Sequence, residues 1–331
     1  MTAARRRRIG LGLGLALAAV ALALLARRLD VDAVLGALRT LGWGGFAVLL
    51  VIQALLIAIA GLAWWWLLPP AASTPTRRFV LAQRFVLARL MRDSAAQILP
   101  FVQLGGVVLG LRVLTLSGVD AAMAMATAVA DLAVEFLGEL AYAALGLGLL
   151  AGLRPGDRLI VPLFAVLLVM ALLGGGFVLA LLRGTGLLAR AAGWFGAGAA
   201  ERVYALGQAL RSIHARPSTL GAAWLVHFAA WILTGVQTWL TLRLMHVPAS
   251  LGAALAIDSL TFGIRSLAFI VPSGLGVQEG AFVMLGGLFG ISPGAALALA
   301  LARRGRELVI GLPALLGWQI FEGRRAWRRA A

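Results

Sequence analysis

The chain has 331 residues, of which 62% are hydrophobic and 13% charged, and its mean hydropathy is +0.97. Soluble domains carry roughly 25% charged residues, so the composition excludes an ordinary soluble domain and predicts an all-α protein that crosses the membrane several times. The 29 lysines and arginines exceed the 13 acidic residues and give a net charge of +16, which indicates membrane topology and attraction to anionic lipid rather than nucleic-acid binding. The absence of cysteine excludes disulfides and cysteine-bound metals, and the three histidines are not spaced as metal ligands.

The first third of the chain predicts two spans and a basic helix. Residues 9–26 are apolar and are flanked on both sides by arginines, which predicts an uncleaved spanning helix rather than a signal peptide. Residues 29–43 form a short amphipathic connection, and residues 45–68 form a second span ending in three tryptophans typical of a membrane interface. Arginines recur at 77, 78, 84, 89 and 92 after a loop, which predicts a helix lying on the cytoplasmic surface.

Residues 93–110 are apolar but contain helix breakers, namely Pro100, Gly105 and Gly106. Proline removes a backbone donor and glycine frees the backbone, so this segment is expected to be a broken, re-entrant helix. In hydrocarbon the released backbone groups need partners, so such breaks occur where protein or a water-filled cavity receives them.

A long helix is predicted over residues 119–153, and it carries three carboxylates, Asp131, Glu135 and Glu139. Their spacing of four residues places them in one stripe on the helix. Asp131 lies roughly 18 Å from the start of the helix, at 1.5 Å per residue, which is near the middle of a bilayer. Charge at this depth is costly and points to a site or a pathway.

After a turn at residues 154–158, spans are predicted over 159–182 and 219–245, separated by a basic connection at 183–217. A second broken segment, residues 265–290, follows, interrupted by Pro272, Gly274 and Gly276. The last helix is expected to be kinked at Pro313 and to end in a basic tail. The basic segments, which include both termini, are placed in the cytoplasm, so the predicted location is a bacterial inner membrane.

The two broken segments align with each other at a shift of 172 residues. This predicts one membrane domain made of two repeats, residues 1–155 with the broken segment 93–110 and residues 156–331 with the broken segment 265–290. The predicted domain has about six full spans and two re-entrant hairpins. Because an odd number of full crossings separates the two broken segments, the second repeat is expected to be inverted in the membrane relative to the first. Inverted repeats with matched broken helices indicate a midplane site and alternating access; the alternative is chance similarity between two apolar sequences. The matching pairs are Pro100 and Pro272, Gly118 and Gly290, Ser94 and Ser266, Ile98 and Ile270, and Glu135 and Glu307.

The last helix brings a cluster of arginines, residues 303, 304 and 306, to a similar depth if it starts at Pro293 with Ser292 as its N-cap. With Arg265 they give four positive charges against five carboxylates, the near balance that a buried network needs. The alternative is that residues 293–302 end at the cytoplasmic surface, where these arginines would be ordinary topology signals. The five carboxylates are Asp131, Glu135, Glu139, Glu279 and Glu307.

Three stretches carry a family resemblance: residues 259–293, residues 302–318 (ARRGRELVIGLPALLGW) and residues 93–106 (DSAAQILPFVQLGG). Here the chain resembles flippase-like membrane proteins related to the transmembrane part of lysylphosphatidylglycerol synthase, and within them the hopanoid-biosynthesis-associated branch. The resemblance implies movement of lipids between leaflets. The large synthases add a soluble aminoacyl-transferase domain that the printed sequence does not show, so the synthase activity is not carried over and the chain is not expected to be an enzyme.

The predicted function is therefore translocation of a lipid, either a hopanoid or an anionic phospholipid, through a polar cavity between two repeats. The alternatives are a membrane scaffold for lipid-synthesis enzymes and, less favoured, an intramembrane lipid-modifying enzyme. No nucleotide-binding motif, metal site or cofactor is predicted, and the expected partners are membrane lipids and lipid-biosynthesis enzymes. The predicted lipid-binding residues are Gln97, Gln103, Asp131, Glu135, Glu139, Arg265, Ser273, Gln278, Glu279, Arg303, Arg306 and Glu307.

Overall fold

A computed structural model of the chain describes residues 31–70, 74–98, 103–183, 197–267, 271 and 274–330. All regular secondary structure in these ranges is α-helical, as the sequence predicts. The first predicted span, together with Pro100, Pro272 and Ser273, lies outside the described residues. The helices are α2 (Val31–Trp66), α3 (Pro75–Ile98), α4 (Gln103–Leu116), α5 (Ala121–Leu153), α6 (Ile160–Arg183), α8 (Ala197–His214), α9 (Pro217–Leu244), α10 (Leu251–Leu267), α11 (Val277–Leu288) and α12 (Pro293–Ala330).

Three of these helices, α2, α5 and α9, are long and apolar enough to cross a bilayer, and α4 and α6 contain shorter apolar stretches. The protein is thus a polytopic α-helical membrane protein. The predicted amphipathic connection and the second span form one helix, α2, interrupted at Gly42, which has φ 62° and ψ 174°. Helix α12 begins as predicted, because Ser292 Oγ accepts a hydrogen bond from the Ala295 amide at 3.3 Å and Pro293 occupies the first position.

Helix α3 corrects the prediction of a surface helix. Its first turns are exposed at Arg77, Arg78 and Arg84, but Arg89 and Arg92 are only 7% and 4% exposed. The helix packs against α2, α4 and α12, so only its beginning lies at the surface. The prediction was wrong for the second half of α3 because the carboxylates that neutralise its arginines lie on another helix.

Helix α3 ends at Ile98 and α4 begins at Gln103, and α10 ends at Leu267 and α11 begins at Val277, so each predicted broken segment contains parts of two helices. Gly274 and Gly276, with φ of 60° and 79°, adopt in the second break a backbone conformation that favours glycine. Gly105 and Gly106, which were expected to break the first segment, lie instead inside helix α4. A Cβ atom on Gly106 would lie 2.4 Å from the carbonyl oxygen of Arg92, so this glycine lets α4 pack closely on α3.

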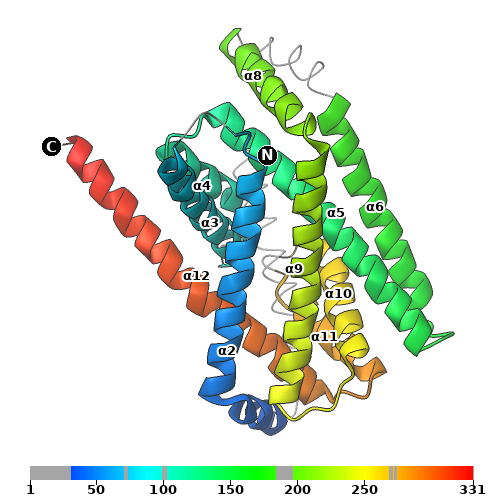
Figure 1. The fold of residues 1–331 in the computed structure, drawn as a ribbon. Coiled ribbons are helices and arrows are strands. Elements are labelled where there is room, and N and C mark those ends of the chain that lie inside the picture. The colour runs from blue at the N-terminus through cyan, green and yellow to red at the C-terminus, as the bar shows by residue number, and fades with distance from the viewer. Residues whose placement is uncertain are drawn as a thin grey trace, which may run out of the picture.

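Helices α2 and α9 lie side by side and run in opposite directions, and α5 and α12 also run in opposite directions (Figure 1). Helix α12 joins two separate parts of the core. Its first half packs with α10 and α11 through Ala296 and Leu299, and its second half packs with α3 and α4 through Trp318. Arg303, Arg306 and Glu307 lie on α12 between these two apolar contacts, where they line a cavity together with residues of α2, α3 and α10.

Candidate functional site

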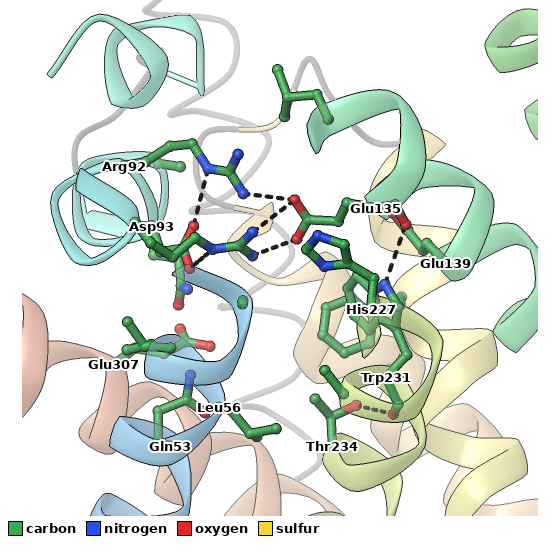
Figure 2. A pocket seen from close by; sticks show the side chains of 18 of the residues that line it. Gln53, Leu56, Arg92, Asp93, Glu135, Glu139, His227, Trp231, Thr234 and Glu307 are labelled. Atoms are coloured by element: carbon green, nitrogen blue, oxygen red, sulfur yellow. Dashed lines mark hydrogen bonds and ion pairs between the residues drawn. The ribbon is translucent and has the colours of Figure 1, made fainter. Parts of the chain in front are cut away.

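A cavity of about 480 Å³ lies among helices α2, α3, α5, α9, α10 and α12. Figure 2 shows polar and charged side chains converging on it from several of these helices. This is unusual inside a membrane domain, where ionisable groups are costly and normally face a site or a water-filled space. The charged residues of its lining are Arg89, Arg92, Asp93, Glu135, Glu139, Arg265, Arg303, Arg306 and Glu307.

Helices α3 and α5 contribute a dense cluster of ion pairs. The guanidinium of Arg92 donates from Nη1 to Asp131 Oδ2 at 2.7 Å and from Nη2 to Glu135 Oε2 at 2.6 Å. Arg89 also pairs with Glu135 and donates from Nε to Asp93 Oδ2 at 2.7 Å. Asp131 is fully buried, so the two arginines offset a carboxylate that would otherwise be very costly at this depth.

Helix α9 joins this cluster through His227 and Trp231. The Nε2 atom of His227 lies 2.9 Å from Asp131 Oδ1, and the indole of Trp231 donates to the backbone carbonyl of Glu135 at 3.4 Å. His227 is almost fully buried and also lines the cavity, so its role extends beyond helix packing. Figure 2 shows both side chains beside Glu135.

A second buried ion pair connects helices α10 and α12. Asp258, which is fully buried, accepts hydrogen bonds from Arg303 Nη1 at 2.6 Å and from the hydroxyls of Thr238, Thr234 and Tyr142 at 2.7, 2.7 and 3.1 Å. Each carboxylate oxygen therefore receives two donors. Such complete satisfaction is what a buried charge requires.

Several polar groups of the cavity have fewer partners. Arg306 is 5% exposed, its Nε has no hydrogen-bond partner, and within the described part of the chain it forms no ion pair. Arg265 donates to the amide oxygen of Gln278 at 3.1 Å, and Glu139 accepts from Ser266. The described carboxylates therefore leave part of the positive charge of this cavity without an ion-pair partner.

One family profile matches almost the whole chain, from residue 11 to residue 314: the lysylphosphatidylglycerol synthase TM region. The chain belongs to this family. No curated protein and no solved structure gives a significant match. Membership of the lysylphosphatidylglycerol synthase TM region family makes this a lipid-related membrane protein, and the match covers the membrane region of the synthases only. It does not separate the branches of the family, so the hopanoid branch stays a prediction.

The structure of this lysylphosphatidylglycerol synthase TM region protein brings most of the predicted site residues together. Asp131 lies behind the cavity wall, bonded to Arg92 and His227, and Gln278 supports Arg265. With the Gln97 amide nitrogen turned toward Glu307, it donates to both carboxylate oxygens at 2.9 and 3.0 Å. The predicted residues that line the cavity are Gln97, Glu135, Glu139, Arg265, Arg303, Arg306 and Glu307.

Glu279 has a different position from the one predicted. Its carboxylate accepts the backbone N–H of Gly276 at 2.8 Å and the Nε of Arg304 at 3.0 Å, so it caps α11 and ties it to α12 without lining the cavity. Ser273 lies outside the described residues, as does the side chain of Gln103.

Sequence reasoning missed Arg89, Arg92, Asp93 and Asp258. A single carboxylate at position 258, inside an apolar helix, was a detectable signal, because an isolated intramembrane acid demands a partner. Within the described residues no group of three or more histidine, aspartate or glutamate side chains could hold a metal ion. The carboxylates of the two clusters are instead satisfied by arginines.

Proposed function

We propose that this protein moves a lipid between the two leaflets, with the polar headgroup passing through the charged cavity and the acyl chains remaining in the bilayer. The observation that carries the proposal is a buried arginine, Arg306, for which the described residues supply no ion-pair partner, in a cavity that several buried ion pairs border. The volume of about 480 Å³ is within the range of small-ligand sites, roughly 300–1,000 Å³. Exposed apolar side chains on α2 and α6, such as Val51 and Phe164, provide lipid-facing surfaces around it.

Alternating access through two inverted repeats is the second part of the proposal. Helices α2, α3, α4 and α5 correspond in order to α9, α10, α11 and α12, and the counterparts α2 and α9, like α5 and α12, run in opposite directions (Figure 1). Two equivalent positions carry opposite charges: Asp93 matches Arg265, and Asp131 matches Arg303, since 265 − 93 and 303 − 131 both equal 172. The repeats thereby face the shared cavity with complementary charges.

The chemistry of the cavity favours an anionic headgroup. Among the described residues, no carboxylate lies within 4 Å of the guanidinium of Arg306 or Arg265, and a guanidinium matches the oxygens of a phosphate diester. An anionic phospholipid is therefore the proposed substrate, and a hopanoid is the second candidate. No nucleotide-binding motif is present in the sequence, so any driving force would come from an ion gradient or from the lipid gradient itself. Glu139, which lines the cavity and accepts a hydrogen bond from Ser266, is the proposed proton carrier.

The test is a lipid-movement assay in reconstituted liposomes, using fluorescent phosphatidylglycerol and a fluorescent hopanoid analogue. Arg306→Gln removes the free guanidinium without breaking an ion pair, so the variant should fold and should lose at least tenfold of the phosphatidylglycerol rate. Arg324→Gln, which removes an exposed arginine from the same helix, is the matched control and should retain the wild-type rate. Wild-type protein that is folded but moves neither lipid, with or without a proton gradient, would refute transport and favour the scaffold.

A further inference from the structure

A second cavity lies at the end of the bundle where helix α2 ends and helices α3, α5 and α9 begin. Its volume is about 680 Å³, and it shares no lining residue with the central cavity. Three arginines, Arg77, Arg78 and Arg216, line it together with Trp65 and Trp66. Because α2, α5 and α9 are the three candidate spans, their ends place this cavity at the depth of lipid headgroups.

The electrostatics of this end cavity favour an anion. Its three arginines outnumber its one carboxylate, Asp120, which is already engaged because it caps α5 by accepting the Met123 amide at 3.0 Å. The Nη1 atom of Arg216 is buried and has no hydrogen-bond partner. This donor is available to a ligand, and leaving it unsatisfied is costly.

Helix ends add to the positive potential. Three helices begin beside the cavity, and the N-terminus of a helix carries roughly half a positive charge. The N-terminus of α9 has no side-chain cap, because its N-cap residue is Arg216 and Pro217 follows. An anion placed here would meet a helix N-terminus and a guanidinium together.

Apart from Ser218 and Thr219, the rest of the lining is apolar, which argues against a free soluble anion. Leu68, Pro69, Leu81, Val119 and Met123 form the walls beside the two tryptophans. The guanidinium of Arg78 lies over the ring of Trp65, 5.6 Å from its centroid, so the aromatic surface and the positive charge are adjacent. A ligand with a phosphate at one end and a hydrocarbon chain at the other satisfies both parts of the cavity.

We propose that this end cavity binds one anionic phospholipid from the adjacent leaflet, with its phosphate at Arg216 and its acyl chain against Trp65 and Trp66. The site is separate from the translocation pathway, and lipid binding there does not depend on transport.

Native mass spectrometry of the detergent-purified full chain tests the site, with phosphatidylglycerol and phosphatidylcholine of identical acyl chains as probes. All variants are made both in the wild-type background and in Arg306→Gln, so that lipid held in the central cavity is counted separately. We expect phosphatidylglycerol to bind roughly tenfold more tightly than phosphatidylcholine. Both lipids carry a phosphate, but the choline cation cancels the charge of phosphatidylcholine and would be repelled by the three arginines, whereas the glycerol headgroup is neutral. Arg216→Gln should abolish this preference in both backgrounds, and Arg211→Gln, an exposed arginine on α8, should preserve it.

Two further arms make the outcome decisive. Arg77→Gln changes an exposed residue of the same cavity and should reduce the preference without affecting folding, which covers the case in which Arg216→Gln does not fold. Glycerol 3-phosphate at millimolar concentration should not displace the lipid. The site is refuted if Arg216→Gln and Arg77→Gln show the same preference for phosphatidylglycerol as Arg211→Gln. It is also refuted if the two lipids bind to the wild-type protein equally tightly. Displacement of the lipid by glycerol 3-phosphate would overturn the assignment of the ligand as a lipid. An Arg306→Gln variant that loses transport should still prefer phosphatidylglycerol at the end cavity, so the two proposals are tested separately.

Discussion

Replacing Asp258 with asparagine should destabilise the fold strongly, although the two side chains have nearly the same shape. One oxygen of Asp258 accepts hydrogen bonds from Arg303 and Thr238, and the other accepts from Thr234 and Tyr142. Asparagine can keep its oxygen toward Arg303 and donate from its NH₂ group to the two hydroxyls, which can also accept, so the variant removes the charge rather than the hydrogen bonds. Arg303, itself buried, would lose its nearest counter-charge and, among the described residues, keep only Glu307, 3.7 Å from its Nε. Breaking a buried pair by removing one partner costs about 3–5 kcal/mol, and the retained hydrogen bonds place Asp258→Asn at the lower end of that range.

The measurement is the free energy of unfolding in mixed micelles, obtained by titration with a denaturing detergent. The matched control is Glu322→Gln, which breaks the exposed Arg112–Glu322 pair, whose side chains are 46% and 29% exposed. Exposed pairs contribute about 0–1 kcal/mol, so the control should lie within that interval. Comparable small losses for both variants would refute the inference that the Asp258 cluster stabilises the structure.

A double variant tests whether the cost comes from the uncompensated cation. Removing Arg303 together with the carboxylate, as Asp258→Asn with Arg303→Met, deletes the cation that loses its nearest counter-charge in the single variant. The double variant should therefore lose less than the sum of the two single losses, by at least about 1 kcal/mol for residues in direct contact. Strict additivity would mean that the two side chains are not coupled.

Three other changes test separate features of the fold. Gly146→Ala should lower the unfolding free energy by about 1–3 kcal/mol, because its Cβ would lie 1.7 Å from Ser259 Oγ. Its control is Gly148→Ala on the same helix, whose Cβ would meet open space, so this variant should be neutral or stabilising in the same titration. Glu279→Gln should weaken the cap of α11 and its link to α12, lowering the thermal unfolding midpoint while leaving the lipid selectivity of the folded fraction unchanged. Gly42→Ala should cost about 1 kcal/mol because φ is 62° at the interruption of α2, although no neighbouring atom is within 4 Å; an unchanged midpoint would contradict the strained backbone.

The sequence identified the central charges on α5 and α12 because they repeat on one helical face in otherwise apolar surroundings. Asp131 and Glu135 are four residues apart, and Arg303 to Glu307 interrupt an alanine-rich helix. The burial of Arg303 and Arg306 agrees with the prediction of a buried network rather than with a surface cluster. These inferences needed only helical periodicity and the cost of charge in lipid.

The α3 arginines could not be recognised in the same way. Arg89 and Arg92 follow a run of exposed arginines at similar spacing, so the local pattern is typical of a surface helix. Their burial depends on carboxylates about 40 residues later in the chain, and only the tertiary structure brings these onto the same side of the cavity. The misplacement of Glu279 has a similar cause, since the capping of α11 depends on backbone geometry at Gly276 that composition does not reveal.

The distribution of bonds between the two halves of the chain, residues 1–155 and 156–331, has a consequence for motion. The buried ion pairs described above join helices within one half: Arg92 to Asp131 in the first and Arg303 to Asp258 in the second. The contacts between described residues that cross the boundary near the cavity are hydrogen bonds. They join His227 to Asp131, Trp231 to the Glu135 carbonyl, Tyr142 to Asp258, Ser266 to Glu139, Gln97 to Glu307, and the Gln237 amide to the Leu49 carbonyl.

Separating opposite charges at low dielectric is far more costly than exchanging one hydrogen bond for another. A rocking movement of one half against the other would keep every buried arginine beside its carboxylate and would break only bonds that a water molecule or a lipid headgroup can replace. Each half would then keep its own buried ion pairs, and the exposed Arg112–Glu322 pair is the described ion pair that joins the two halves. The energy barrier to their relative motion would be set by the small residues and hydrogen bonds at the boundary, and a passing headgroup could lower it by supplying the missing partners.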